Sequence, residues 1–169
     1  MNKEQLRAKQ LPLKDKYKVN PESAVITLKA RGNLSEGIAC SVETGRALVE
    51  AGLHEATGGS GLQVCSGDML LQALVACAGV TLRAVATSLE IQIASGELTA
   101  EGDLDFKGTL GVSKESPVGF KNIRLRFQLE TDASEEQLQT LLKLTERYCV
   151  VYQTLAQSPI LNATISAKH

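Results

Sequence analysis

The sequence of 169 residues contains no tryptophan and only 4% aromatic residues, so its core has to be built from aliphatic side chains. Its formal net charge of −1 gives no basic excess that would attract nucleic acid or an anionic membrane. Two histidines and the absence of a C-x-x-C motif argue against a zinc site. Residues 1–18 are charged and lack the apolar run of a signal peptide. We therefore expect a cytoplasmic protein that binds no nucleic acid, membrane or metal.

The most apolar stretch, residues 65–90, predicts one long helix. Ser66 or Asp68 is expected to cap it, and the charge of Asp68 is favourable in its first turn. A helix that is apolar nearly all round is a buried one, and this stretch is too short and too interrupted by Arg83 for a membrane span. One face carries small residues with Cys77 in their middle, which would let a second element approach closely.

We expect an N-terminal arm or short helix, within residues 1–20, followed by a single domain, residues 21–169. Residues 25–30 and 37–42 are typical of a β-hairpin, with Gly32-Asn33 marking its turn. Residues 47–56 indicate a short helix, and the glycine-rich residues 57–61 a loop that leads into the long helix.

After residue 90 the apolar period changes to two, which indicates strands over residues 91–94 and 97–106. Residues 122–130 form the clearest strand, with aliphatic and aromatic side chains on one face and polar ones on the other. Ser134 and Gln137 have the spacing of a capping box, and an apolar stripe from residue 138 to 155 predicts a second helix. Residues 160–167 are typical of a final strand. This order predicts an α+β protein with helices packed on antiparallel sheet.

Structural disulfides are rare in the cytoplasm, so a reactive cysteine pair there is more often catalytic. The four cysteines are Cys40, Cys65, Cys77 and Cys149. Cys77 and Cys149 lie on the packing faces of the two predicted helices. A buried cysteine often only fills space. However, Lys143 and Arg147 precede Cys149 and Arg83 follows Cys77, and a nearby cation lowers the pKa of a thiol.

Three stretches of the sequence carry a resemblance to a known family. They are LLQALVACAGVTL at residues 70–82, the pairs Gly111-Val112 and Gly119-Phe120 before a strand, and CVVYQTL at residues 149–155. Together, over residues 22–167, they resemble the OsmC/Ohr family. The resemblance implies antiparallel sheets packed on two long central helices in an intertwined homodimer.

The same resemblance implies a thiol-dependent peroxidase that reduces organic hydroperoxides without a bound cofactor. The cysteine matched by Cys77 attacks the peroxide and becomes a sulfenic acid. The cysteine matched by Cys149 condenses with it to a disulfide, which an external dithiol reduces. Aliphatic residues at helical spacing from both cysteines predict a preference for bulky, apolar peroxides. These surroundings are Leu70, Leu74, Leu142 and Tyr152.

The sequence departs from the family's peroxidases in the groups that would activate the thiols. Their Pro-Glu pair, ten to eleven residues before the first cysteine, is replaced by Ser66 and Gly67. The nearest acid, Asp68, lies about 900° of helix before Cys77 and thus on the opposite side. We interpret Asp68 as a first-turn charge rather than a catalytic partner.

The family's catalytic arginine comes from a loop before the central helix, and no motif chooses between Arg31 and Arg46 for this role. His54 lies near the entry of that loop and is most simply a surface-loop residue. The family's proline after the second cysteine is replaced by Val150, which predicts that Cys149 lacks a clean helix start. Cys40 and Cys65 are interpreted as structural.

Two functions therefore stay open on the sequence alone. The first is a two-cysteine organic hydroperoxide reductase. The second is a non-catalytic relative that keeps the fold and binds a small apolar ligand or partner, because fold does not imply function. In either case the apolar helix over residues 65–90 predicts an obligate homodimer, since one subunit cannot easily cover it.

Overall fold

The computed structural model describes residues 3–35, 39–42, 51–62 and 64–167, and within them the side chains except those of 3–7, 9, 28–35, 39–42 and 51. The helices are α1 (Lys3–Val19), η1 (Pro21–Ala24), η2 (Glu55–Thr57), α2 (Ser66–Ser88), α3 (Phe106–Thr109), α4 (Glu135–Tyr148) and α5 (Val150–Ala156). The strands are β1 (Val25–Ser35), β2 (Ala39–Val42), β3 (Ala51–Gly52), β4 (Val64–Cys65), β5 (Ser95–Asp105) and β6 (Phe120–Glu130).

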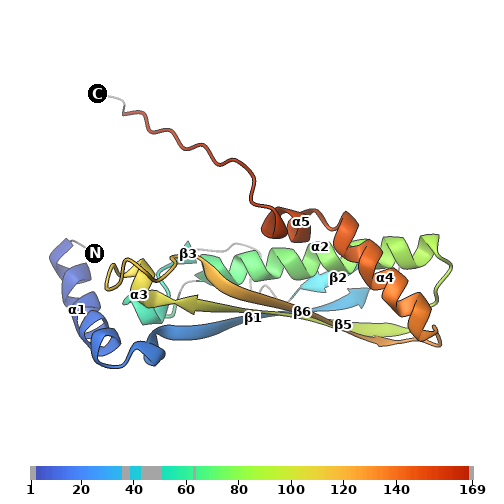
Figure 1. Ribbon diagram of the computed structural model, residues 1–169, viewed down its shortest axis with the longest axis horizontal. Helices are drawn as coiled ribbons and strands as arrows, with labels where there is room; N and C mark the ends of the chain where they lie inside the picture. The colour runs from blue at the N-terminus through green and yellow to red at the C-terminus, as the bar shows by residue number, and fades with distance from the viewer. Residues whose placement is uncertain (1–2, 36–38, 43–50, 63, 168–169) are drawn as a thin grey trace.

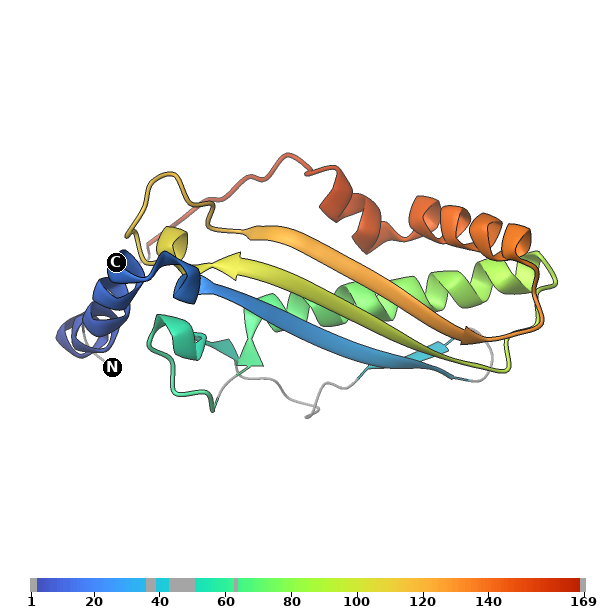
Figure 2. The same ribbon diagram turned by 60° about the horizontal axis from the view of Figure 1, so that its bottom comes forward.

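The main sheet has four strands in the order β2-β1-β5-β6, and every neighbouring pair is antiparallel. Ala100 in the middle of β5 lies opposite Ala30 of β1 and Leu125 of β6. The helix α2 runs along one face of this sheet, with α4 and α5 following one another beside it (Figures 1 and 2). The predicted α+β architecture with antiparallel sheet and helices is thereby confirmed.

The core forms between α2 and the sheet because both elements turn aliphatic side chains toward the same layer. The main cluster includes Leu71, Leu74, Val75, Ala78, Leu98, Ala100 and Leu104. A second cluster lies at the other end of α2 and includes Leu82, Val85, Ala86, Ile91, Ile93 and Leu141. Burying one such leucine contributes roughly 1.5–3 kcal/mol, so α2 anchors the fold.

The predicted long helix is confirmed, but two details of it were wrong. Cys65 occupies the N-cap position and makes no side-chain capping bond, whereas Ser66 and Asp68 lie inside the helix. With 23 residues, α2 is also long and apolar enough to cross a membrane by length and composition alone. Its packing against β1, β5, α4 and α5 is that of a core helix.

The predicted hairpin forms, but Gly32-Asn33 is not its turn. Both residues continue β1, with Gly32 paired to Val42 on one side and to Leu98 on the other. The backbone pairing of these two residues with β2 on one side and β5 on the other outweighs their local preference for a turn. The predicted strand at 91–94 was wrong too, since this segment is irregular and only packs Ile91 and Ile93 into the core.

The two ends of the chain have different outcomes: the N-terminal segment is helical, one of the two expected alternatives, whereas the C-terminal segment differs from prediction. The expected arm is the helix α1, anchored where the buried Tyr17 hydroxyl donates to the Ala56 carbonyl at 2.7 Å. The short helix expected over residues 47–56 falls partly outside the described residues, and Ala51–Gly52 is a strand. Residues 160–167 form no strand and extend away from the body, because within the described chain no strand pairs with them (Figure 1).

The capping box of the second helix is confirmed, but the helix is not continuous. Gln137 N–H donates to Ser134 Oγ at 3.3 Å, and Ser134 N–H donates back to Gln137 Oε1 at 2.9 Å. The apolar stripe that predicted one helix is divided between α4 and α5, with Cys149 between them in an extended conformation. The described chain therefore shows one long central helix, α2, rather than two.

Candidate active site

The break between α4 and α5 brings the second predicted cysteine against the first. Cys77 lies half-buried in the middle of α2, and Cys149, only 1% exposed, lies at the break. The packing of α5 on α2 places the two thiols close enough to influence each other's ionisation. The pair that the sequence singled out on two separate helices is thus one site.

The surroundings of Cys77 favour its thiolate. Burial raises the pKa of its thiol, but hydrogen bonding to the Val151 N–H, the Cys149 thiol, the Val150 N–H and the Thr81 hydroxyl outweighs burial, so the pKa lies below its usual range. Thr81 is one turn further along the small-residue face of α2. Two of the four donors that stabilise a negative sulfur are therefore backbone groups, and none of them is a charged side chain.

The surroundings of Cys149 favour its protonated thiol. Burial is the main cause that raises the pKa of Cys149 to about 11, and the neighbouring Cys77 adds to it. The sulfur of Cys149 accepts the N–H of Tyr152 at 3.4 Å and so caps α5. The expectation that Val150 deprives Cys149 of a helix start was wrong, because a cysteine in extended conformation caps the helix without the family's proline.

A groove of about 470 Å³ with both apolar and polar lining residues opens between β6, α4 and α5; it is lined by neighbours of the two cysteines but not by the cysteines themselves. Leu74, Leu142 and Tyr152, three of the four residues predicted to surround the cysteines, line it. The fourth, Leu70, is 38% exposed on α2. At the α4–α5 end, Glu146 accepts the hydroxyl of Tyr152 at 3.3 Å. The aliphatic and aromatic residues of the groove offer a surface on which an apolar chain could pack.

The comparison with protein families agrees with this architecture. A family model described as "OsmC-like protein" matches residues 59–163. The chain belongs to the OsmC-like family. Both thiols of the candidate site lie within the matched residues, whereas Arg31, Arg46 and His54 precede them.

Two solved structures share the fold of this OsmC-like protein. An OsmC-like hydroperoxide resistance protein from Jannaschia sp. CCS1 gives a TM-score of 0.61 at 17% identity, over 85% of this chain and 95% of that chain. An OsmC-like protein from Mycoplasma pneumoniae gives 0.55 at 16% identity, over 79% of this chain and 86% of that chain. At such identities the likeness shows the fold alone. No curated protein sequence matches the chain.

His54 and Asp68 lie in a separate pocket of about 430 Å³ that Cys65 also lines. The Nδ1 atom of His54 accepts the Ala56 N–H at 3.0 Å, and its ring stacks on Phe106 with centroids 4.9 Å apart. His54 is thus a half-buried structural residue rather than a surface-loop one. Burial raises the pKa of Asp68, and His54 lowers it in part. Neither residue contributes to the shift at Cys77, in line with the predicted position of Asp68 across the helix.

The predicted activating cations are not what lowers the pKa of Cys77. Arg83 donates from Nη1 to the Ile93 carbonyl at 2.9 Å, at the other end of the core. Arg147 lies over the ring of Tyr148, 5.5 Å from its centroid, and Lys143 is exposed. Arg31 belongs to β1, opposite Thr99, but its side chain and the whole of Arg46 lie outside the described residues.

Sequence reasoning missed the backbone N–H groups of Val150 and Val151 because backbone donors leave no mark in residue types. The spacing of four between Cys77 and Thr81 was the one available signal, since it places both on one helix face. Among the described residues, no group of three or more histidine, cysteine, aspartate and glutamate side chains could hold a metal.

Proposed function

We propose that this OsmC-like protein is a thiol-dependent peroxidase that reduces organic hydroperoxides through Cys77 and Cys149. The observation that carries the proposal is the pairing of two thiols with opposite pKa shifts beside an apolar groove. A lowered pKa supplies the thiolate, which is the nucleophilic form of cysteine. The name of the Jannaschia relative, a hydroperoxide resistance protein, supports the same chemistry.

The reaction assigns a different role to each sulfur. The Cys77 thiolate attacks one oxygen of the peroxide, the O–O bond breaks, and the alkoxide leaves and takes a proton to become the alcohol. Cys77 is then a sulfenic acid. The Cys149 sulfur attacks the Cys77 sulfur, a disulfide forms, and the hydroxyl leaves as water with the Cys149 proton. An external dithiol then reduces the disulfide and becomes oxidised itself, so no bound cofactor is needed.

The apolar groove favours bulky alkyl peroxides over hydrogen peroxide. Its apolar lining includes residues from four elements: Leu74 of α2, Leu142 of α4, Leu155 of α5, and Ile123, Leu125 and Phe127 of β6. Each methylene buried against such a surface contributes about 0.8 kcal/mol to binding. A few carbons would therefore separate an alkyl hydroperoxide from hydrogen peroxide by orders of magnitude in affinity.

The decisive experiment supplies the reduced protein with one equivalent of cumene hydroperoxide and maps its disulfides by mass spectrometry. We expect a Cys77–Cys149 disulfide, steady consumption of cumene hydroperoxide with dithiothreitol, and slower consumption of hydrogen peroxide. If no peroxide is consumed and no such disulfide forms, the peroxidase proposal fails. The apolar groove would then favour the non-catalytic alternative, a protein that binds a small apolar ligand.

We also infer that two copies of the chain associate. On α2, Met69, Leu70 and Val80 expose apolar side chains that the rest of the chain leaves uncovered. Along residues 157–167, Ile160 and Ile165 are 91% and 99% exposed. Exposed apolar surface of this kind marks an interaction site, and a helix shared between two subunits is typical of obligate dimers. Sedimentation velocity at micromolar concentration should show twice the chain mass; a stable folded monomer would contradict the inference.

A further inference from the structure

Three side chains hold the break between α4 and α5 in one shape. In the last turn of α4, Glu146 accepts the Tyr152 hydroxyl at its side-chain Oε1, with a donor–acceptor distance of 3.3 Å. The backbone carbonyl of the same residue accepts the Gln153 side-chain amide at 2.8 Å. This carbonyl is one of the last four of α4, which have no partner within the helix. Glu146 is thus bonded twice to α5, once through its side chain and once through its backbone.

Between these contacts lies the segment that meets Cys77. Cys149 leaves α4 with φ −72° and ψ 109°, and its sulfur accepts the Tyr152 N–H. Val150 and Val151, which follow at once, belong to the helix α5 that packs on α2, and their N–H groups are among the causes that lower the pKa of Cys77. A small rotation of α5 against α4 would withdraw all of these donors together, because they belong to one helical turn.

We propose that Glu146, Tyr152 and Gln153 are positioning residues whose contacts across the α4–α5 break hold Cys149, Val150 and Val151 against Cys77. We call these three residues the α4–α5 clamp. None of their side chains is among the causes that shift the pKa of either thiol, so they act on Cys77 through the segment they hold. Their importance for turnover rests on the proposed peroxidase function, but their effect on the resting thiol does not.

The clamp needs a hydrogen-bond acceptor at residue 146 rather than a charge. The titratable groups that line the groove beside the thiols are Lys121 from β6, Glu146 from α4 and Tyr152 from α5. Burial is the first cause that raises the pKa of Tyr152, and the Glu146 carboxylate adds to it. That carboxylate is not among the causes that shift Cys77 or Cys149. Glutamine at residue 146 can still accept the tyrosine hydroxyl, so it should preserve the clamp.

The test is the pH profile of alkylation at Cys77 in the reduced protein without peroxide, followed by mass spectrometry after brief iodoacetamide treatment. Tyr152→Phe and Glu146→Ala remove the same bond, so each should slow alkylation at neutral pH by about threefold, the effect of a pKa higher by half a unit. The double variant should be no slower than either single variant. Gln153→Ala removes the second bond and should add to Tyr152→Phe. Glu146→Gln should restore the wild-type profile.

Two controls separate positioning from general loosening of the structure. Glu136→Ala changes an exposed acid in the first turn of the same helix and should leave the profile unchanged. Alkylation of Cys65 in each sample should stay constant, because it lies in the other pocket. The proposal is overturned if Tyr152→Phe, which is nearly isosteric, leaves the Cys77 profile unchanged, or if Glu146→Gln behaves like Glu146→Ala. Either result would leave the peroxidase proposal standing, and failure of peroxide reduction would leave the clamp standing.

Discussion

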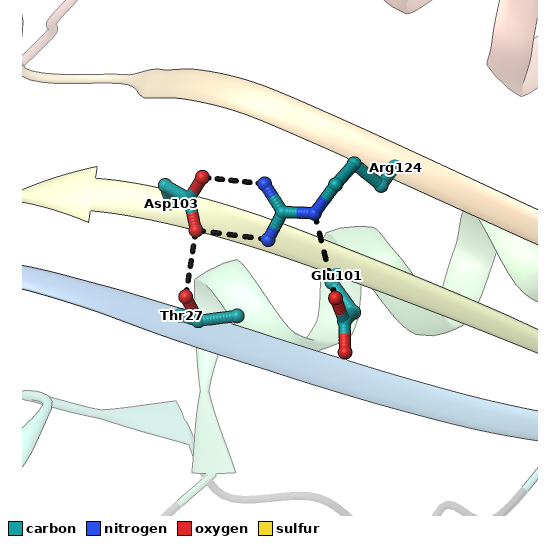
Figure 3. Close-up of polar contacts among 4 residues, drawn as sticks. All are labelled: Thr27, Glu101, Asp103 and Arg124. Atoms are coloured by element: carbon teal, nitrogen blue, oxygen red, sulfur yellow. Dashed lines mark hydrogen bonds and ion pairs between the residues drawn. The ribbon is translucent and has the colours of Figure 1, made fainter.

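Asp103 lies on one face of the main sheet, and Cys77 lies on the helix α2 that covers the other face. Both groups have lowered pKa values, but the causes differ. On the face away from α2, Arg124 of β6 holds Asp103 of β5 through two hydrogen bonds of 2.5 and 3.0 Å (Figure 3). Thr27 of β1 donates a third at 2.6 Å. Hydrogen bonding to Arg124 is the main cause that lowers the pKa of Asp103 to about 2. On the α2 face, Cys77 has no comparable charged partner among the described residues.

The difference teaches what makes a lowered pKa useful for chemistry. Arg124 also donates from Nε to Glu101 at 3.4 Å, so its guanidinium is occupied by two carboxylates and joins β5 to β6. An anion paired in this way is stabilised but no longer available to react. Cys77 receives only backbone, hydroxyl and thiol donors, which favour its thiolate and leave the sulfur free to attack. The same shift serves structure on one face and, under the proposed function, reactivity on the other.

The largest effect should come from removing the reactive sulfur itself. Cys77→Ser is expected to reduce peroxide turnover to background, because Cys77 is the thiol with the lowered pKa and the pKa of its partner Cys149 is raised. Cys149→Ser should still react once and stop at a sulfenic acid that dimedone traps, since the resolving thiol is missing. The measurement is peroxide consumption with dithiothreitol, together with mass spectrometry of the dimedone adduct.

The matched control for these variants is Cys65→Ser, which removes a half-buried thiol from the pocket of His54 and Asp68 and should retain turnover. Equal loss in Cys65→Ser and Cys77→Ser would contradict the assignment of roles. A dimedone adduct at Cys149 in wild type would reverse the order of the two cysteines.

The next largest effect is the expected difference in alkylation rate between Cys77 and Cys149. At neutral pH, iodoacetamide should label Cys77 well before Cys149, because the pKa of Cys149 is raised to about 11 and little of it is ionised. Labelling of Cys149 should appear only as the pH approaches that value. Thr81→Val removes the hydroxyl that helps lower the pKa of Cys77 and should slow its labelling a few-fold. Labelling of Cys149 ahead of Cys77 at neutral pH would refute the comparison.

The sequence predicted the parts of this site that have a periodic signal. The long apolar stretch of α2, the alternation in β6 and the Ser134–Gln137 capping box are local patterns, and each appears in the structure. The pairing of Cys77 with Cys149 was anticipated through the resemblance to the OsmC/Ohr family, because residue types and helix faces alone do not distinguish it from space-filling cysteines. The remaining features of the site depend on contacts between residues that are far apart in the sequence, and no periodic pattern encodes such contacts.

The interruption between α4 and α5 at Cys149 is a feature that the sequence pattern did not predict. The apolar stripe continues at helical spacing across the break, and no glycine or proline marks it. At the break, Glu146 contacts Tyr152 and Gln153, six and seven residues away, and the spacing of apolar residues does not reveal such contacts. Residue types suggested that Lys143 and Arg147 would activate the thiol. Backbone N–H groups do so instead, and every residue but proline carries one.

The smallest effect should be found on the outer face, where Arg124→Gln removes the cation shared by Asp103 and Glu101. We expect the melting temperature at neutral pH to fall by a few degrees, since partly exposed ion pairs contribute little but two carboxylates would lose their partner. Peroxide turnover per folded molecule should not change, because this network lies on the face away from the thiols (Figure 3). Loss of turnover at unchanged stability would mean that the two faces are coupled.

Acid unfolding sharpens the same test. Because the folded pKa of Asp103 is about 2, below its ordinary value of about 4, this group stabilises the fold fully above pH 4. That contribution is lost progressively as the pH falls from about 4 toward 2, since the unfolded chain takes up the proton first. In Arg124→Gln the pKa of Asp103 rises toward its ordinary value, so stability should decline less steeply over this range. Asp103→Asn should flatten the same part of the curve, as measured by urea unfolding at successive pH values. An unchanged slope in both variants would show that the Arg124–Asp103 pair does not form in solution.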